Sequence, residues 1–140
     1  VVAGAKRPES VGDPVRLRGA VVGVGDGIYV EPKIAHGGTK DFDAGRQVAI
    51  ILDEGPTVVL TSKRVQPISS QQLVNVGLDP SDFAVITAKG VNGPRAGYRD
   101  ICGEFIEADT PGITRSSVTG FDYLHRRRPM YPYEPGTTYP

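Results

Sequence analysis

Two cationic side chains, Lys89 and Arg95, flank a glycine-bearing segment and are the residues of this sequence best suited to bind a ligand. The glycines between them allow a backbone to approach a bound molecule closely, and an arginine can hold a carboxylate through two parallel hydrogen bonds. A peptide or acyl substrate carries such a carboxylate. The alternative is structural, with Lys89 solubilising a strand end and Arg95 paired with Asp100 or Glu104. The sequence alone supports the two alternatives about equally.

A second polar group, Asp109 and Thr110, lies in the turn-forming sequence Asp-Thr-Pro-Gly. A carboxylate, a hydroxyl and bare backbone N–H groups here would complete the edge of a site for a polar substrate. A proline-glycine turn stabilised by the aspartate explains the same residues, and this interpretation is favoured. We therefore keep Asp109 and Thr110 as substrate-binding candidates beside Lys89 and Arg95, and assign no catalytic residue.

The elements that would position these side chains form a predicted strand-helix-strand unit. Residues 83–88 and 103–108 are rich in apolar and β-branched side chains, and Pro94 favours the first turn of a short helix between them. Lys89 and Asp109 follow the two expected strands. If these strands are parallel, the candidate side chains gather beyond one sheet edge, which is where open α/β sheets bind ligands.

The amino-terminal half is expected to begin with a hairpin. From Val15 the side chains alternate between apolar and charged, as in a half-buried strand. Asp26-Gly27 favours a tight turn, and residues 28–30 are expected to return as the partner strand. Residues 32–45 then predict an exposed loop, because they are rich in glycine and polar side chains.

The centre of the chain predicts buried strands followed by a helix. Residues 47–52 and 57–61 are apolar runs separated by a tight turn. Ser69 and Gly77 are typical of the start and the stop of a short helix over residues 70–76. From residue 57 onward the order is strand, helix, strand, helix, strand. The predicted fold class is therefore mixed α/β: a hairpin plus a β-α-β-α-β unit in a partly parallel sheet.

The length of 140 residues predicts one domain with irregular ends. Residues 1–14 lack periodicity and are expected to be an arm or linker, and residues 15–124 to form the single α/β domain, closing with a short helix from Ser116. Residues 125–140 are rich in proline and tyrosine and predict an extended tail. Because the first residue is Val1 rather than methionine, we expect the chain to be part of a longer protein.

Composition argues against several classes of partner. Sixteen basic residues balance sixteen acidic ones, so no global field attracts nucleic acid or an anionic membrane. No apolar run approaches the roughly 20 residues of a membrane-spanning helix. The single cysteine, Cys102, excludes an internal disulfide and indicates a reducing, cytoplasmic compartment.

Metal and phosphate sites are not expected in this chain. His36 and His125 lie far apart, and neither has a second histidine or a carboxylate at the spacing of a zinc-binding helix. The arginine run at residues 126–128 is isolated in a neutral chain, so we expect it to pair with an acidic surface or with a missing partner domain rather than with phosphates.

Several short motifs occur in an order typical of one protein family. They are Asp26-Gly27, residues 60–67, residues 76–80, Lys89 followed by Arg95-Ala96-Gly97-Tyr98, residues 107–112 and residues 127–132. With these motifs the chain resembles, over about residues 15–135, the carboxy-terminal domain of the microcystinase C (MlrC) family of zinc-dependent metallopeptidase-like proteins. The chain departs from the pattern at Gly93-Pro94, where related sequences are expected to carry a histidine and an aromatic residue.

The resemblance implies a hydrolase that acts on amide bonds, in a longer protein whose amino-terminal domain holds the zinc. This chain would then contribute substrate-side residues, for which Lys89 and Arg95 match, and would be inactive by itself. The expected partners are that metal-binding domain and a small peptide or amide substrate, without nucleic acid or membrane, and a homo-oligomer is left open. The alternative is a non-catalytic interaction or assembly module derived from the same family.

Overall fold

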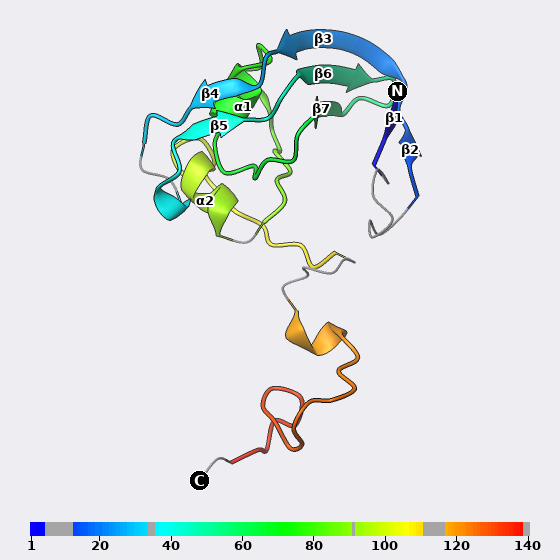
Figure 1. Cartoon of the computed structure of the whole chain (residues 1–140), viewed down its shortest axis with the longest axis vertical. Helices are drawn as coiled ribbons and strands as arrows, with labels where there is room; N and C mark the ends of the chain where they lie inside the picture. The colour runs from blue at the N-terminus through cyan, green and yellow to red at the C-terminus, as the bar shows by residue number, and fades with distance from the viewer. Residues whose placement is uncertain (5–12, 34–35, 91, 111–116, 139–140) are drawn as a thin grey trace. The chain divides into compact units, whose positions relative to one another are not determined.

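The computed structural model describes residues 1–4, 13–33, 36–90, 92–110 and 117–138 (Figure 1). The chain divides into two compact units, Val1–Glu107 and Ala108–Pro140, which we call the amino-terminal and carboxy-terminal units. Every strand pairing in the described residues is antiparallel.

The largest sheet has three strands in the order β3 (Gly19–Gly25), β6 (Gln47–Leu52) and β7 (Thr57–Thr61), which lie side by side in Figure 1. The bounds of β6 and β7 confirm the two apolar strands predicted from the sequence. Between them Gly55 adopts a φ of 106° and donates its N–H to the Leu52 carbonyl at 2.9 Å. The break in the apolar pattern is therefore a tight turn, as expected.

A second sheet pairs β4 (Ile28–Val30) with β5 (Asp41–Asp43), which lies inside the segment predicted to be a loop. Tyr29 and Phe42 are register partners, and their rings stack with centroids 5.0 Å apart. Such cross-strand aromatic pairs stabilise a sheet beyond their buried area. The buried cluster built on this pair comprises Tyr29, Phe42, Ala44 and Ile68.

A third, two-stranded sheet joins β1 (Val2–Ala3) to β2 (Val15–Arg16).

The hairpin predicted at Asp26-Gly27 was wrong, because β3 pairs with β6 and β4 pairs with β5. The Asn75 side chain holds the turn instead. Its Oδ1 accepts the Gly27 N–H at 3.0 Å, and its Nδ2 donates to Asp26 Oδ1 at 3.1 Å and to the Ile28 carbonyl at 3.2 Å. Asp26-Gly27 is therefore a corner that connects β3 of the three-stranded sheet to β4 of the second sheet.

The predicted parallel β-α-β arrangement, and with it the α/β fold class, was also wrong. Residues 83–88 and 103–108 form no strand. The β-branched Val85 is 80% exposed and Ile106 is 86% exposed, so these side chains face solvent. The local composition of both segments suits a strand, but among the described residues no neighbouring strand supplies a hydrogen-bonding edge, and backbone pairing is what makes a β-branched run a strand. In the described residues the fold consists of three small antiparallel sheets with short helices.

Both central helices predicted from the sequence are present. α1 (Gln71–Val74) is followed by a turn that ends at Gly77, which adopts a φ of 78°. The Leu78 N–H donates a hydrogen bond to the Leu73 carbonyl at 3.1 Å. This is the left-handed stop expected of that glycine. α2 (Gly93–Tyr98) carries Pro94 in its first turn, also as expected. Short 3₁₀ segments lie at His36–Gly38, Pro80–Asp82 and Val118–Gly120.

The carboxy-terminal tail is folded back on itself rather than extended, which corrects the sequence-based expectation. The N–H groups of Tyr133 and Glu134 donate to the Met130 carbonyl at 3.0 and 3.2 Å, forming a compact turn. The helix expected from Ser116 begins outside the described residues, and the segment after it holds one 3₁₀ turn, Val118–Gly120.

Candidate functional site

Helix α2 is fixed by close backbone packing on Ile68 and Ser69. A Cβ added at Gly97 would lie 2.1 Å from the Ile68 carbonyl oxygen, and one at Gly93 would lie 2.5 Å from Ile68 Cγ2. Tyr98 is 4% exposed, and its hydroxyl donates to the Ser69 carbonyl at 3.4 Å. The glycines, four residues apart on one helix face, therefore let α2 approach closely and determine where it presents Arg95.

Arg95 lies at the solvent-facing side of α2 with its side chain 40% exposed. Its Nη2 donates to Glu107 Oε1 at 2.8 Å, and its guanidinium carbon lies 5.2 Å from the centre of the Phe105 ring. Neither Asp100 nor Glu104, the partners considered from the sequence, makes this ion pair; Asp100 pairs with Lys33. An exposed ion pair contributes little to stability, so another carboxylate can replace Glu107 at small cost.

Lys89 is exposed and has no hydrogen-bond or ion-pair partner in the described part of the chain. It precedes Gly90, whose φ of 135° favours glycine. Lys89 and Arg95 both belong to the amino-terminal unit, whereas Asp109 and Thr110, both exposed, belong to the carboxy-terminal unit. The last two residues of the Asp-Thr-Pro-Gly sequence lie outside the described residues.

Two tyrosines near α2 act as neutral polar groups. Burial, followed by the proximity of Cys102, raises the pKa of Tyr98 to about 12. Burial, followed by the proximity of Tyr98, raises the pKa of Tyr29 to about 12. At neutral pH both hydroxyls keep their protons, so neither tyrosine can serve as a base there.

A protein-family model described as MlrC C-terminus matches residues 1–125. The chain belongs to the MlrC C-terminal family. The match spans both candidate cations and the whole of α2, and confirms the family resemblance identified from the short motifs. No curated protein and no solved structure showed a significant match to the chain.

Among the described residues of this MlrC C-terminal domain, no three His, Cys, Asp or Glu side chains converge so as to hold a metal ion. These residues therefore do not fit the zinc that the family resemblance implies, and we assign no step through the metal to them. Within the same described residues, no helix combines the length and the apolar character required to cross a bilayer.

Sequence analysis missed Glu31, a carboxylate in the interior of the domain. Glu31 is 5% exposed and follows β4, two residues after the buried Tyr29. Residues two apart on an extended chain share one face, so the burial of Tyr29 was a signal that Glu31 points inward as well.

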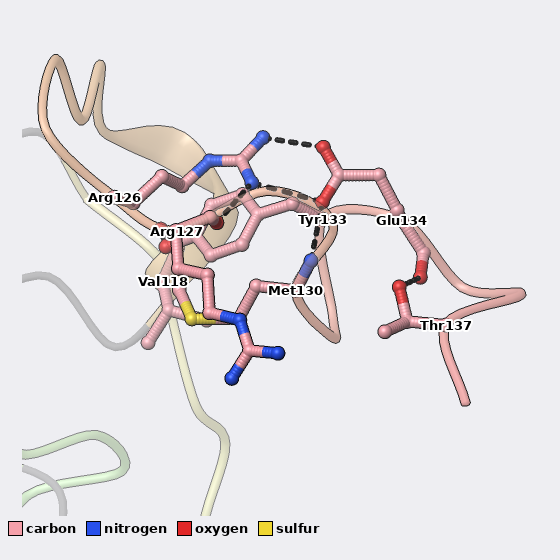
Figure 2. Close-up of polar contacts among 7 residues, drawn as sticks. All are labelled: Val118, Arg126, Arg127, Met130, Tyr133, Glu134 and Thr137. Carbon is pink, nitrogen blue, oxygen red and sulfur yellow. Dashed lines mark hydrogen bonds and ion pairs between the residues drawn. The ribbon is translucent and has the colours of Figure 1, made fainter. Parts of the chain in front are cut away.

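The arginine run contributes to a network in the carboxy-terminal unit (Figure 2). Arg126 donates through Nη1 and Nη2 to the two carboxylate oxygens of Glu134 at 2.8 and 2.6 Å, and its guanidinium carbon lies 4.3 Å from the centre of the Tyr133 ring. The Met130 N–H also donates to Glu134, at 2.8 Å. For Arg126 this confirms the expected pairing with an acidic side chain. The Arg126 hydrogen bonds, more than that of Met130, lower the pKa of Glu134 to about 2.

Proposed function

We propose that this MlrC C-terminal domain completes the substrate cleft of a zinc-dependent amide or peptide hydrolase whose amino-terminal domain holds the metal. The observation that carries the proposal is that residues 1–125 match the family model while Lys89 extends into solvent without a partner in the described residues. An exposed cation beside a glycine loop is available to an anionic ligand. We also propose a reducing, cytoplasmic compartment, for which the single cysteine of this chain is the support.

The proposed role of this domain is to orient the substrate and to stabilise negative charge. Lys89 supplies a mobile point charge, and Arg95 can exchange Glu107 for a substrate carboxylate and hold it through two hydrogen bonds. Zinc, when bound by the other domain, supplies a Lewis acid and an activated water. Cationic groups placed near the reacting amide stabilise the charge that develops during attack.

Substitutions in the intact protein test this role. Lys89→Ala and Arg95→Ala should each lower kcat/KM by about 10- to 100-fold, the loss expected for one charge-assisted hydrogen bond. Lys40→Ala and Arg18→Ala are matched controls, because Lys40 is an exposed lysine and Arg18 is an exposed arginine that pairs with Asp53. Turnover of both test variants at the control level contradicts the proposed role.

A second candidate function is a non-catalytic assembly module, and strand β3 favours it. β3 is an edge strand of its sheet within the described residues, it carries no charge, and Val21, Val22 and Val24 are exposed. An uncharged apolar edge strand is typical of a surface that another chain segment covers. Metal content and amide hydrolysis of the intact protein separate the candidates: a metal-free, inactive protein supports assembly, and a zinc-bound, active one supports the hydrolase.

A further inference from the structure

A small pocket opens beside α2 on the amino-terminal unit, with a volume of about 80 Å³. One wall is the segment that follows β4, with Glu31 and Lys33, and the other walls include Ser70, the α2 residues Ala96 and Gly97, and Asp100, which follows α2. We call it the Glu31 pocket. Lys33 and Asp100 form an ion pair between two of these walls, with both side chains more than half exposed. Such a pair is weakly held, so it opens at small cost.

Glu31 is the unusual residue of this pocket. Its Oε1 accepts the Lys33 backbone N–H at 3.1 Å, but its Oε2 is buried and has no hydrogen-bond partner among the described residues. Native structures rarely leave a buried carboxylate oxygen unsatisfied, because its desolvation is costly. Solvent does not reach Oε2 in this conformation, so a ligand contact involves a turn about the last side-chain torsion, which is soft for glutamate.

The charges define what the pocket can accept. Glu31 and Asp100 are acidic and Lys33 is basic, so the lining carries one net negative charge. Lys33 already neutralises Asp100, which leaves the Glu31 carboxylate for a ligand. A divalent metal ion is a poor fit, because no third carboxylate, cysteine or histidine converges here among the described residues. A singly charged cation with several N–H donors matches the lining.

The size of the pocket limits the ligand to a head group. A volume of about 80 Å³ is far below the roughly 300–1,000 Å³ of clefts that enclose a whole small-molecule ligand. We propose that the Glu31 pocket binds the ammonium or guanidinium end of a longer molecule, with Glu31 as the charge partner and the Ser70 hydroxyl as a second acceptor. The inference does not depend on the hydrolase assignment, because it uses none of Lys89, Arg95 or zinc.

The cation has two sources, an external amine or a lysine or arginine from the remainder of the protein. For an external source, titration of the intact protein with methylguanidinium or methylammonium chloride should show one site per chain, whereas sodium chloride at equal ionic strength should show none. Glu31→Gln should weaken this binding about 10- to 100-fold and Ser70→Ala about 5-fold. Glu54→Gln, an exposed acid in the β6–β7 turn, is the matched control and should leave binding unchanged.

For an internal source, the probes should not bind, because the pocket is already filled. Glu31→Gln and Glu31→Met should then each lower Tm of the intact protein by roughly 6–15 °C, since removal of one partner leaves a buried cation unpaired. The absence of probe binding together with an unchanged or raised Tm in both variants overturns the proposal. That result would mean that water alone supplies the hydrogen bonds of the Glu31 carboxylate. If Glu31→Gln does not fold, Ser70→Ala serves as the variant for the binding test.

Discussion

The interactions that stabilise the amino-terminal unit differ in kind from those that stabilise the carboxy-terminal unit. In the amino-terminal unit, antiparallel ladders and close glycine contacts fix the backbone, as where Gly97 meets the Ile68 carbonyl. In the carboxy-terminal unit, one side-chain network centred on Glu134 joins Arg126, Met130 and Tyr133 (Figure 2). The first arrangement rests on backbone pairing and packing, whereas the second rests on side-chain hydrogen bonds, an ion pair and aromatic contacts.

This difference bears on function, because both candidate cations belong to the amino-terminal unit. The family model ends at residue 125, directly before Arg126, so the Glu134 network lies outside the matched part. We therefore expect changes in the amino-terminal unit to affect the shared family role. Changes around Glu134 should have local consequences.

The largest expected effect comes from adding a methyl group where Gly97 of α2 packs against the Ile68 carbonyl. Gly97→Ala should lower the free energy of unfolding by about 1–3 kcal/mol, because the new methyl group overlaps the Ile68 carbonyl and forces a backbone shift. Gly103→Ala is the matched control: nothing lies within 4 Å of the added Cβ, so the change should stay within about 0.5 kcal/mol. Urea unfolding curves measure both, and equal stability of the two variants would break the comparison.

A slightly smaller effect is expected at the corner between the two sheets. Asn75→Ala removes three hydrogen bonds to Asp26, Gly27 and Ile28, and should cost about 1–2 kcal/mol in unfolding free energy. Asn92→Ala is the control, because the Asn92 side chain makes no capping hydrogen bond. If both asparagine variants unfold at the same urea concentration, the corner is not held by Asn75.

Arg126→Ala should sharpen the comparison by acting on one unit alone. Loss of the paired hydrogen bonds to Glu134 should increase proteolytic cleavage within residues 117–138 several-fold, while hydrogen exchange in β6 stays unchanged. Arg127→Ala, which removes an exposed neighbouring arginine, should leave both readouts at the wild-type level. Faster exchange in β6 on Arg126→Ala would show that the two units are coupled.

The smallest effect concerns the charge of Glu134 and becomes visible only when the pH is lowered. Its pKa is lowered from 4.5 to about 2 in the folded chain, so its contribution is fully present above pH 4.5 and is lost as pH falls toward 2. The carboxyl carbon of Glu134 should therefore titrate in NMR with a midpoint near 2. In the Arg126→Ala variant the midpoint should rise toward the ordinary value, and a wild-type midpoint near 4.5 would contradict the network.

Local sequence patterns were sufficient where neighbours in sequence decide the structure. The apolar runs of β6 and β7 are bounded by a turn of Asp, Glu, Gly and Pro, and the stop of α1 depends on Gly77 itself. The corner at Asp26-Gly27 could not be predicted, because the Asn75 side chain that holds it lies 48 residues away from Gly27. Residues 83–88 likewise look like a strand until the exposure of Val85 is known.

The candidate site was predictable in residue type but not in partners. Lys89 and Arg95 stand out as cations beside glycines, and α2 forms where Pro94 indicated. The Glu107 partner of Arg95 could not be chosen from among several nearby acids, because that choice depends on the path of a segment without regular structure. Their role in substrate binding stays a prediction.

Lysine labelling of the intact protein tests the central claim, that Lys89 faces the substrate cleft. Acetylation rates of Lys89 and the exposed control Lys40 are measured by mass spectrometry, with and without a saturating small peptide that carries a free carboxylate. We predict that the peptide slows labelling of Lys89 at least about 10-fold, since a bound carboxylate shields the amine, and leaves Lys40 unchanged. Equal labelling of Lys89 in the presence and absence of a peptide that the protein hydrolyses would contradict the claim.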